Sequence, residues 1–171
     1  ADSNITFEQH RDIFYMIGND QEESILVLCT DSKKNSFKEM LFIRETNDHI
    51  THWEGEKLTK EKAKDISGIN NVYWTNEFKD ILNQIIKQSE NVYINTNEHY
   101  RQNVETQTRE DRFIEELKKI GGINFKKSNP ILQKQRSVKD EIEIRLIEHA
   151  CNITRKGFER VLKFIKPGVW E

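Results

Sequence analysis

A long stretch of helical periodicity close to the end of the chain limits the folds that the chain can adopt. Apolar residues recur there at spacings of three and four over residues 138–165, and Pro167 ends the pattern. One apolar set comprises Ile142, Leu146, Ala150, Ile153, Gly157, Val161 and Ile165, and a second comprises Ile144, Ile147, Cys151, Phe158, Leu162 and Phe164. Together they form a stripe wide enough to need cover on more than one side.

What covers this stripe is left open by the sequence. The helix docks back on the preceding domain, or it packs on a region that the chain does not include. We expect the side chains of Ile142, Leu146, Ala150 and Ile153 to pack in one of these ways, because a free apolar patch of this length is unfavourable in water. We also expect the chain to be a piece of a longer protein, since it begins without an initiator Met.

The preceding residues alternate between strand-like and helix-like patterns. Strands are predicted at residues 24–30, 40–45, 50–53, 71–74 and 92–94. Helices are predicted from the N-cap Thr59 to Gly68, from the N-cap Thr75 through Ile86, and over residues 105–120. Asn129-Pro130 indicates a turn, and Ser137 is the predicted N-cap of the long helix. This alternation favours an α/β layered domain.

Composition excludes several classes of function. Lys and Arg number 27 against 29 Asp and Glu, so a net charge of −2 gives no basic field for a nucleic acid. No apolar run approaches the ~20 residues that span a bilayer, so a membrane is not an expected partner. The net charge likewise makes a nucleic acid an unexpected partner. The two cysteines, Cys29 and Cys151, are interpreted as buried apolar residues, with a single disulfide as the alternative. We therefore expect a cytoplasmic protein.

No catalytic constellation is visible in the sequence. Phosphate-binding loops, nucleophile elbows and zinc-ligand spacings are absent from it. His49 and His52 would point to opposite faces of the predicted strand, so they would not share a metal ion. Trp53 stands out because it lies in a polar stretch at a predicted strand end. It is a candidate contact residue, with a half-buried strand Trp as the alternative.

Four stretches carry a resemblance to a known family. They are Ala1-Asp2-Ser3 through Phe14-Tyr15 to Gly18; Leu41-Phe42-Ile43-Arg44 followed by Trp53-x-Gly55-x-Lys57; Gly68-Ile69-x-x-Val72; and Arg136-x-x-Lys139-x-x-x-Glu143-Ile144 followed by Ala150-x-x-Ile153 and Lys166-Pro167-Gly168-x-x-Glu171. The chain resembles the N-terminal, creatinase/prolidase-type domain of Xaa-Pro aminopeptidases, which are metallopeptidases with a pita-bread catalytic domain. The last stretch resembles the passage that opens that catalytic domain.

The resemblance implies a fold and an organisation. The fold would be α/β, with a mixed β-sheet flanked by helices in a ribonuclease H-like motif, plus a long C-terminal helix that belongs to the next domain. The N-terminal domain would occupy residues 1–136, with its start truncated. Residues 137–171 would be the first helix of a truncated catalytic domain.

The resemblance also implies a function for the parent protein. The parent would be a hydrolase that removes the N-terminal residue preceding proline from peptides with proline at the second position. It would use two Mn²⁺ or other divalent metal ions held by the absent domain. This fragment would then contain no catalytic or metal-binding residue and would be inactive alone.

For this domain, the resemblance implies oligomerisation and capping of the substrate cleft. Trp53 matches a Trp that reaches toward the active site of a neighbouring subunit in a homo-oligomer. Asp2 matches an acidic residue in an Arg/Tyr hydrogen-bond network near the cleft. Two alternatives stay open: a peptidase-like protein-binding module without activity, and a prolidase- or creatinase-type relative.

Overall fold

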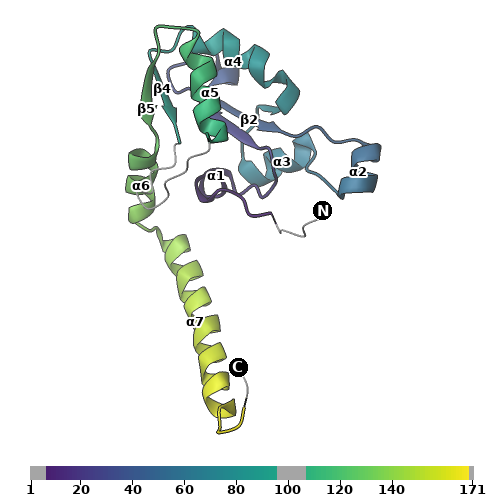
Figure 1. The fold of residues 1–171 in the computed structure, drawn as a ribbon, viewed down its shortest axis with the longest axis vertical. Coiled ribbons are helices and arrows are strands. Elements are labelled where there is room, and N and C mark those ends of the chain that lie inside the picture. The colour runs from purple at the N-terminus through teal and green to yellow at the C-terminus, as the bar shows by residue number, and fades with distance from the viewer. Residues whose placement is uncertain (1–6, 96–106, 170–171) are drawn as a thin grey trace. The chain divides into compact units, whose positions relative to one another are not determined.

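The computed structural model describes residues 7–95 and 107–169 of the chain. Its internal contacts divide the chain into two units, one of Ala1–Val92 with Glu105–Lys126 and one of Tyr93–Val104 with Lys127–Glu171. The strands of the first unit's sheet are β1 (Ile25–Leu28), β2 (Glu39–Ile43) and β3 (Val72–Trp74). Its helices are α1 (Arg11–Ile17), α2 (Asp48–Glu54), α3 (Lys60–Ser67), α4 (Phe78–Ile86) and α5 (Arg109–Lys118), with 3₁₀ turns η1 (Asn35–Phe37) and η2 (Thr75–Glu77) (Figure 1).

The sheet of the first unit is mixed, with β2 between the other two strands. β1 pairs with β2 antiparallel, with Leu26 opposite Leu41, and β3 pairs with β2 parallel, with Tyr73 opposite Phe42. The predicted strands 24–30, 40–45 and 71–74 are therefore confirmed, and so is a mixed sheet flanked by helices. The central place of β2 explains its unbroken apolar run, because a strand covered on both faces needs apolar residues at every position.

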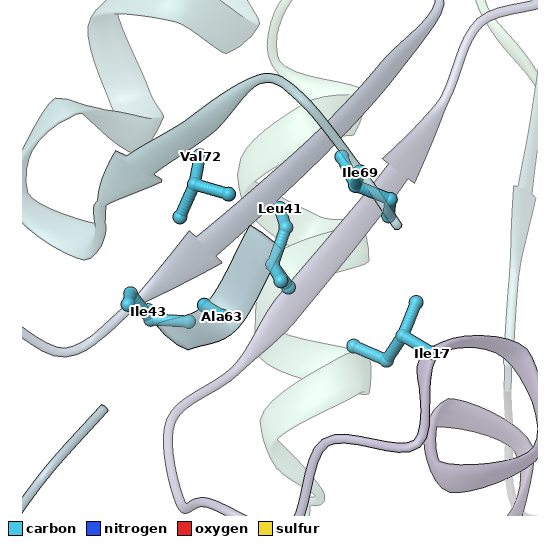
Figure 2. Packing of buried hydrophobic residues seen from close by; sticks show 6 residues of the cluster. All are labelled: Ile17, Leu41, Ile43, Ala63, Ile69 and Val72. Carbon is cyan, nitrogen blue, oxygen red and sulfur yellow. The ribbon is translucent and has the colours of Figure 1, made fainter. Parts of the chain in front are cut away.

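One face of β2 builds the first part of the core. Leu41 and Ile43 point to this face and are fully buried, since alternate residues of a strand share a side. Figure 2 shows them gathered with Ile17 of α1, Ala63 of α3 and two residues next to or in β3, Ile69 and Val72. The helix α3 begins and ends as the sequence predicts: Thr59 accepts a hydrogen bond from the Lys62 amide, and Gly68 adopts a left-handed φ of 73°.

The opposite face of β2 packs on α4. Met40 and Phe42 are fully buried there with Ile85 of α4. The Phe42 ring meets Phe78 edge to face, with centroids 5.1 Å apart, and stacks on Tyr73 at 5.4 Å. Helices thus cover both faces of the sheet, which confirms the predicted α/β layering.

The predicted strand at residues 50–53 is wrong, because this segment is the helix α2. Its Ile-Thr-His-Trp sequence has high β-propensity, but that preference depends on cross-strand neighbours. The Asn47 side chain instead accepts a hydrogen bond from the Ile50 amide at 2.9 Å, and Gly55 ends the helix with φ 82°. An Asn N-cap and a terminal Gly were the signals that could have predicted the helix. A smaller correction applies at Thr75, which begins the turn η2 rather than capping α4.

Beyond α4, β4 (Asn91–Ile94) pairs with β5 (Asn124–Lys127) in a two-stranded sheet. The predicted strand at 92–94 is confirmed as β4, whereas β5 was not predicted. The predicted turn at Asn129-Pro130 is wrong, because these residues open the helix α6 (Asn129–Ser137). A proline is tolerated in a first helical turn, where its missing N–H costs no hydrogen bond.

The long helix of the second unit is α7 (Glu141–Phe164), and its N-cap is Asp140 rather than Ser137. An Asp140 carboxylate oxygen accepts from the Glu143 amide at 2.8 Å, and the Asp140 amide donates to the Glu143 carboxylate at 3.0 Å. This reciprocal pair is a capping box. Ser137 instead ends α6, with its hydroxyl donating to the Lys134 carbonyl. No helix among the described residues is long and apolar enough to cross a bilayer.

Among the described residues of the second unit, no packing partner covers the α7 stripe. Ile142, Leu146 and Ile153 are 62%, 65% and 59% exposed. Cys151 is exposed as well, so the prediction that both cysteines are buried is wrong; Cys29 is half-buried, and the two are not joined in a disulfide. Periodicity shows which face of a helix is apolar but not whether the chain supplies its cover. Packing of the stripe on another chain stays a prediction.

Candidate functional site

The two residues singled out by sequence have different places in the structure. Asp2 lies outside the described residues. Trp53 belongs to the helix α2 and is the residue before its last one, Glu54. In the first unit α2 sits at the margin, beyond the end of β2 (Figure 1).

An alternating series of charges joins α2 to the rest of the first unit. Arg44, which directly follows β2, forms a fork with Glu54 at the end of α2: Nη1 lies 2.6 Å from Oε2, and Nη2 donates to Oε1 at 2.8 Å. The same Nη1 lies 3.7 Å from Oε1 of Glu22. Glu22 in turn accepts a hydrogen bond from Nζ of Lys57. We call these four residues, Lys57, Glu22, Arg44 and Glu54, the charge series.

Two members of the charge series, Glu22 and Arg44, have pKa values shifted toward their charged forms. The hydrogen bond from Lys57 lowers the pKa of the Glu22 carboxyl, with further lowering by the charge of Arg44. The fork with Glu54 raises the pKa of the Arg44 guanidinium. A general acid at neutral pH needs a raised carboxyl pKa. Glu22 has the opposite shift, so its arrangement suits a structural or binding contact.

The loop after α1 is hydrogen-bonded to the segment that follows α2. Oε1 of Gln21 accepts from the Leu58 amide at 2.6 Å. The Gln21 carbonyl accepts from the Ser24 hydroxyl at 2.8 Å, and that hydroxyl oxygen accepts from Nδ2 of Asn19 at 3.0 Å. Because Asn19 and Gln21 are buried, these hydrogen bonds hold the loop in one conformation. Nothing in the residue pattern predicted this network.

The histidines of α2 are placed differently from the sequence expectation. His49 and His52 belong to one helix, where a spacing of three puts them on the same side rather than on opposite faces of a strand. Both are exposed. Within residues 7–95 and 107–169, no group of three or more His, Cys, Asp or Glu side chains could hold a metal ion.

The sequence of this chain matches a family model described as "Aminopeptidase P, N-terminal domain" over residues 1–93. That match covers more than half of the chain. It includes the strands β1 to β3, the helix α2 and all four members of the charge series.

Similar proteins extend the match along the chain. An Xaa-Pro aminopeptidase from Haemophilus influenzae is 26% identical over 174 residues, covering 99% of this chain and 37% of its own length. Intermediate cleaving peptidase 55 from Schizosaccharomyces pombe is 21% identical over 160 residues, covering 92% of this chain and 33% of its own. The chain thus spans about a third of the length of these relatives.

Solved structures show the same fold. Aminopeptidase P from Escherichia coli, in its low-pH form, superposes with a TM-score of 0.82 at 22% identity, covering 100% of this chain and 39% of the other. Because the identity is only 22%, this likeness establishes the fold alone. The family is established by the sequence match to the family model. The chain belongs to the family of aminopeptidase P N-terminal domains.

Proposed function

We propose that this chain serves as the accessory N-terminal domain of an Xaa-Pro aminopeptidase. The parent enzyme would release the N-terminal residue from peptides with proline at the second position. The domain would assemble the homo-oligomer and complete the wall of the substrate cleft. The family match over residues 1–93 carries this proposal, and the Xaa-Pro aminopeptidase from Haemophilus influenzae supports it.

The chemistry of the parent would depend on residues beyond this chain. A site with two Mn²⁺ or other divalent metal ions would supply the nucleophile and polarise the scissile carbonyl. By resemblance, its ligands would be two Asp, one His and two Glu of the catalytic domain. In this arrangement residues 1–136 form the accessory domain, and residues 137–171 are the first helix of the catalytic domain. The fragment would then be inactive by itself.

Within the domain, the contact with the cleft would fall to Trp53 and Asp2. A Trp has a large apolar surface and one polar N–H, which suits an anchor in an interface that is partly wet. The helix α2 would present Trp53 to the cleft of a second copy. The Asp2 carboxylate would orient a guanidinium near the substrate through two parallel hydrogen bonds.

The Trp53 contact is tested by Trp53→Ala in the longer peptidase that carries this domain. We expect kcat/KM on an Xaa-Pro peptide to fall roughly tenfold, because a buried interface Trp is among the costliest residues to truncate. Metal content, measured by elemental analysis, should stay the same. His49→Ala changes an exposed residue of the same helix and serves as the control. Unchanged kinetics in Trp53→Ala would remove Trp53 from the site.

The rival functions are distinguished by comparing this 171-residue chain with the longer protein. We expect hydrolysis of the Xaa-Pro peptide only from the longer protein, in the presence of Mn²⁺. Failure of the longer protein to hydrolyse any peptide would favour a protein-binding module. Hydrolysis confined to dipeptides that end in proline would favour a prolidase-type relative.

A further inference from the structure

We infer that Arg44 is a positioning residue for α2 and sets the direction in which Trp53 is presented. This inference rests on the proposed role of Trp53 in the cleft of a second copy. It assigns to Arg44 a role that is exerted through α2 rather than by direct contact with the substrate. Its physical basis is the fork between Arg44 and Glu54, the residue that directly follows Trp53.

The described side chains of α2 give the helix little apolar packing. Of its side chains that are described, His49, Thr51, His52 and Glu54 are exposed and Ile50 is only half-buried. The helix has seven residues, which is too short to be stable in isolation. Its N-terminal end is held by the cap from Asn47. Its C-terminal end therefore depends on contacts made by Glu54 and by the residues just after it.

The fork is suited to fixing this end in one orientation. Two parallel charge-assisted hydrogen bonds between a guanidinium and a carboxylate define a plane as well as a distance. A lysine ammonium at the same place would keep the charge but make no planar fork. Arg44 also stands on a rigid base, because it directly follows the fully buried residues Phe42 and Ile43 of β2.

The other members of the charge series brace the same turn. The helix ends at Gly55, whose positive φ lets the chain reverse direction. Glu54 before this glycine is held by Arg44, and Lys57 after it is held by Glu22. Glu22 also approaches Arg44 at 3.7 Å, so the two anchors are linked. Loss of the fork should therefore free the end of α2 without unfolding the sheet.

The first experiment measures amide hydrogen exchange in this chain. Arg44→Lys and Glu54→Gln should speed the exchange of the Gly55 amide, which donates to the Thr51 carbonyl, by roughly two- to fivefold. Amides of α3 should exchange as before, which shows that the fold is intact. Glu115→Gln removes an exposed ion pair with Lys118 on α5 and should leave α2 unchanged. Unchanged exchange at Gly55 in both Arg44 and Glu54 variants would overturn the inference.

The second experiment is a double-mutant cycle in the longer peptidase. If Arg44 acts through Trp53, Arg44→Lys should lower kcat/KM in the parent sequence and have no further effect in Trp53→Ala. Additive losses would show that Arg44 acts by another route and would overturn its positioning role. If Trp53→Ala alone is without effect, the proposed cleft contact fails, and the exchange measurement still decides whether Arg44 holds α2.

Discussion

The strand β2 and the helix α7 each carry a clear apolar pattern, but the environments of their apolar side chains are opposite. Met40, Leu41, Phe42 and Ile43 of β2 are all fully buried, with α1 and α3 on one side and α4 on the other. No described residue of the 24-residue α7 is buried. An apolar pattern therefore specifies an element and its apolar face, whereas burial of that face also needs a covering surface.

The difference has an energetic consequence. Each large apolar side chain of β2 contributes about 1.5–3 kcal/mol through removal from water. The exposed side chains of α7 contribute little of this kind within the single chain. Its helical state instead depends on its length, its capping box and ion pairs such as that between Arg155 and Glu159, 3.2 Å apart.

The largest expected effect comes from truncating a residue of β2. Phe42→Ala should lower the free energy of unfolding by about 3–5 kcal/mol, because it removes ring contacts with Phe78 and Tyr73 and leaves a cavity. Urea denaturation monitored by circular dichroism measures the loss. Leu146→Ala on α7 is the matched control and should change stability by less than about 0.5 kcal/mol. A comparable loss in both variants would contradict the contrast between the two regions.

A smaller effect is expected from removing helix caps. Asp140→Ala should cost about 1 kcal/mol at the start of α7, because the Ile142 and Glu143 amides lose their acceptor. The loss should appear as reduced ellipticity at 222 nm with an unchanged urea midpoint. Thr59→Ala at α3 should instead lower the midpoint, since α3 contributes the buried Ala63 to the core. A shifted midpoint in Asp140→Ala would show that α7 unfolds together with the sheet.

The smallest expected effect is a pH dependence of the local stability of β3. The Trp74 amide donates to the Glu77 carboxylate at 2.8 Å and lowers its pKa, with help from Lys60. A lowered pKa adds stability above the ordinary glutamate value of about 4.3, and this is lost as the pH falls through the lowered value. The protection of β3 amides, taken relative to their intrinsic exchange rates at each pH, should therefore fall at acid pH, and less so in Glu77→Gln. An identical acid response in Glu77→Gln would assign the effect to other carboxylates.

Sequence reasoning succeeded where a local signal and the tertiary contacts agree. The apolar run of β2, the Thr59 cap and the Gly68 stop of α3 each specify an element within a few residues, and the structure has them there. It failed at residues 50–53 because the strand prediction rested on β-propensity and left out the N-cap Asn47. It failed at Pro130 because an Asn-Pro pair can open a helix as well as a turn.

The candidate site divides in the same way. Trp53 could be identified from the sequence because a Trp in a polar stretch is unusual, and Arg44 lay within the motif that suggested the family. The pairing of Arg44 with Glu54, and of Glu22 with Lys57, could not. Glu22 and Lys57 are 35 positions apart, and only the folding of the loop after α1 against the end of α2 brings them together.

Residue order is enough to predict the family, the alternation of strands and helices, and the amphipathic character of α7. These properties follow from residue order, because periodicity, caps and motifs are local. Tertiary contacts were needed to establish that β2 is the central strand and that Arg44, Glu22 and Lys57 come together near the end of α2. These properties depend on which distant segments meet, and the free energy of such contacts is not encoded in any one stretch.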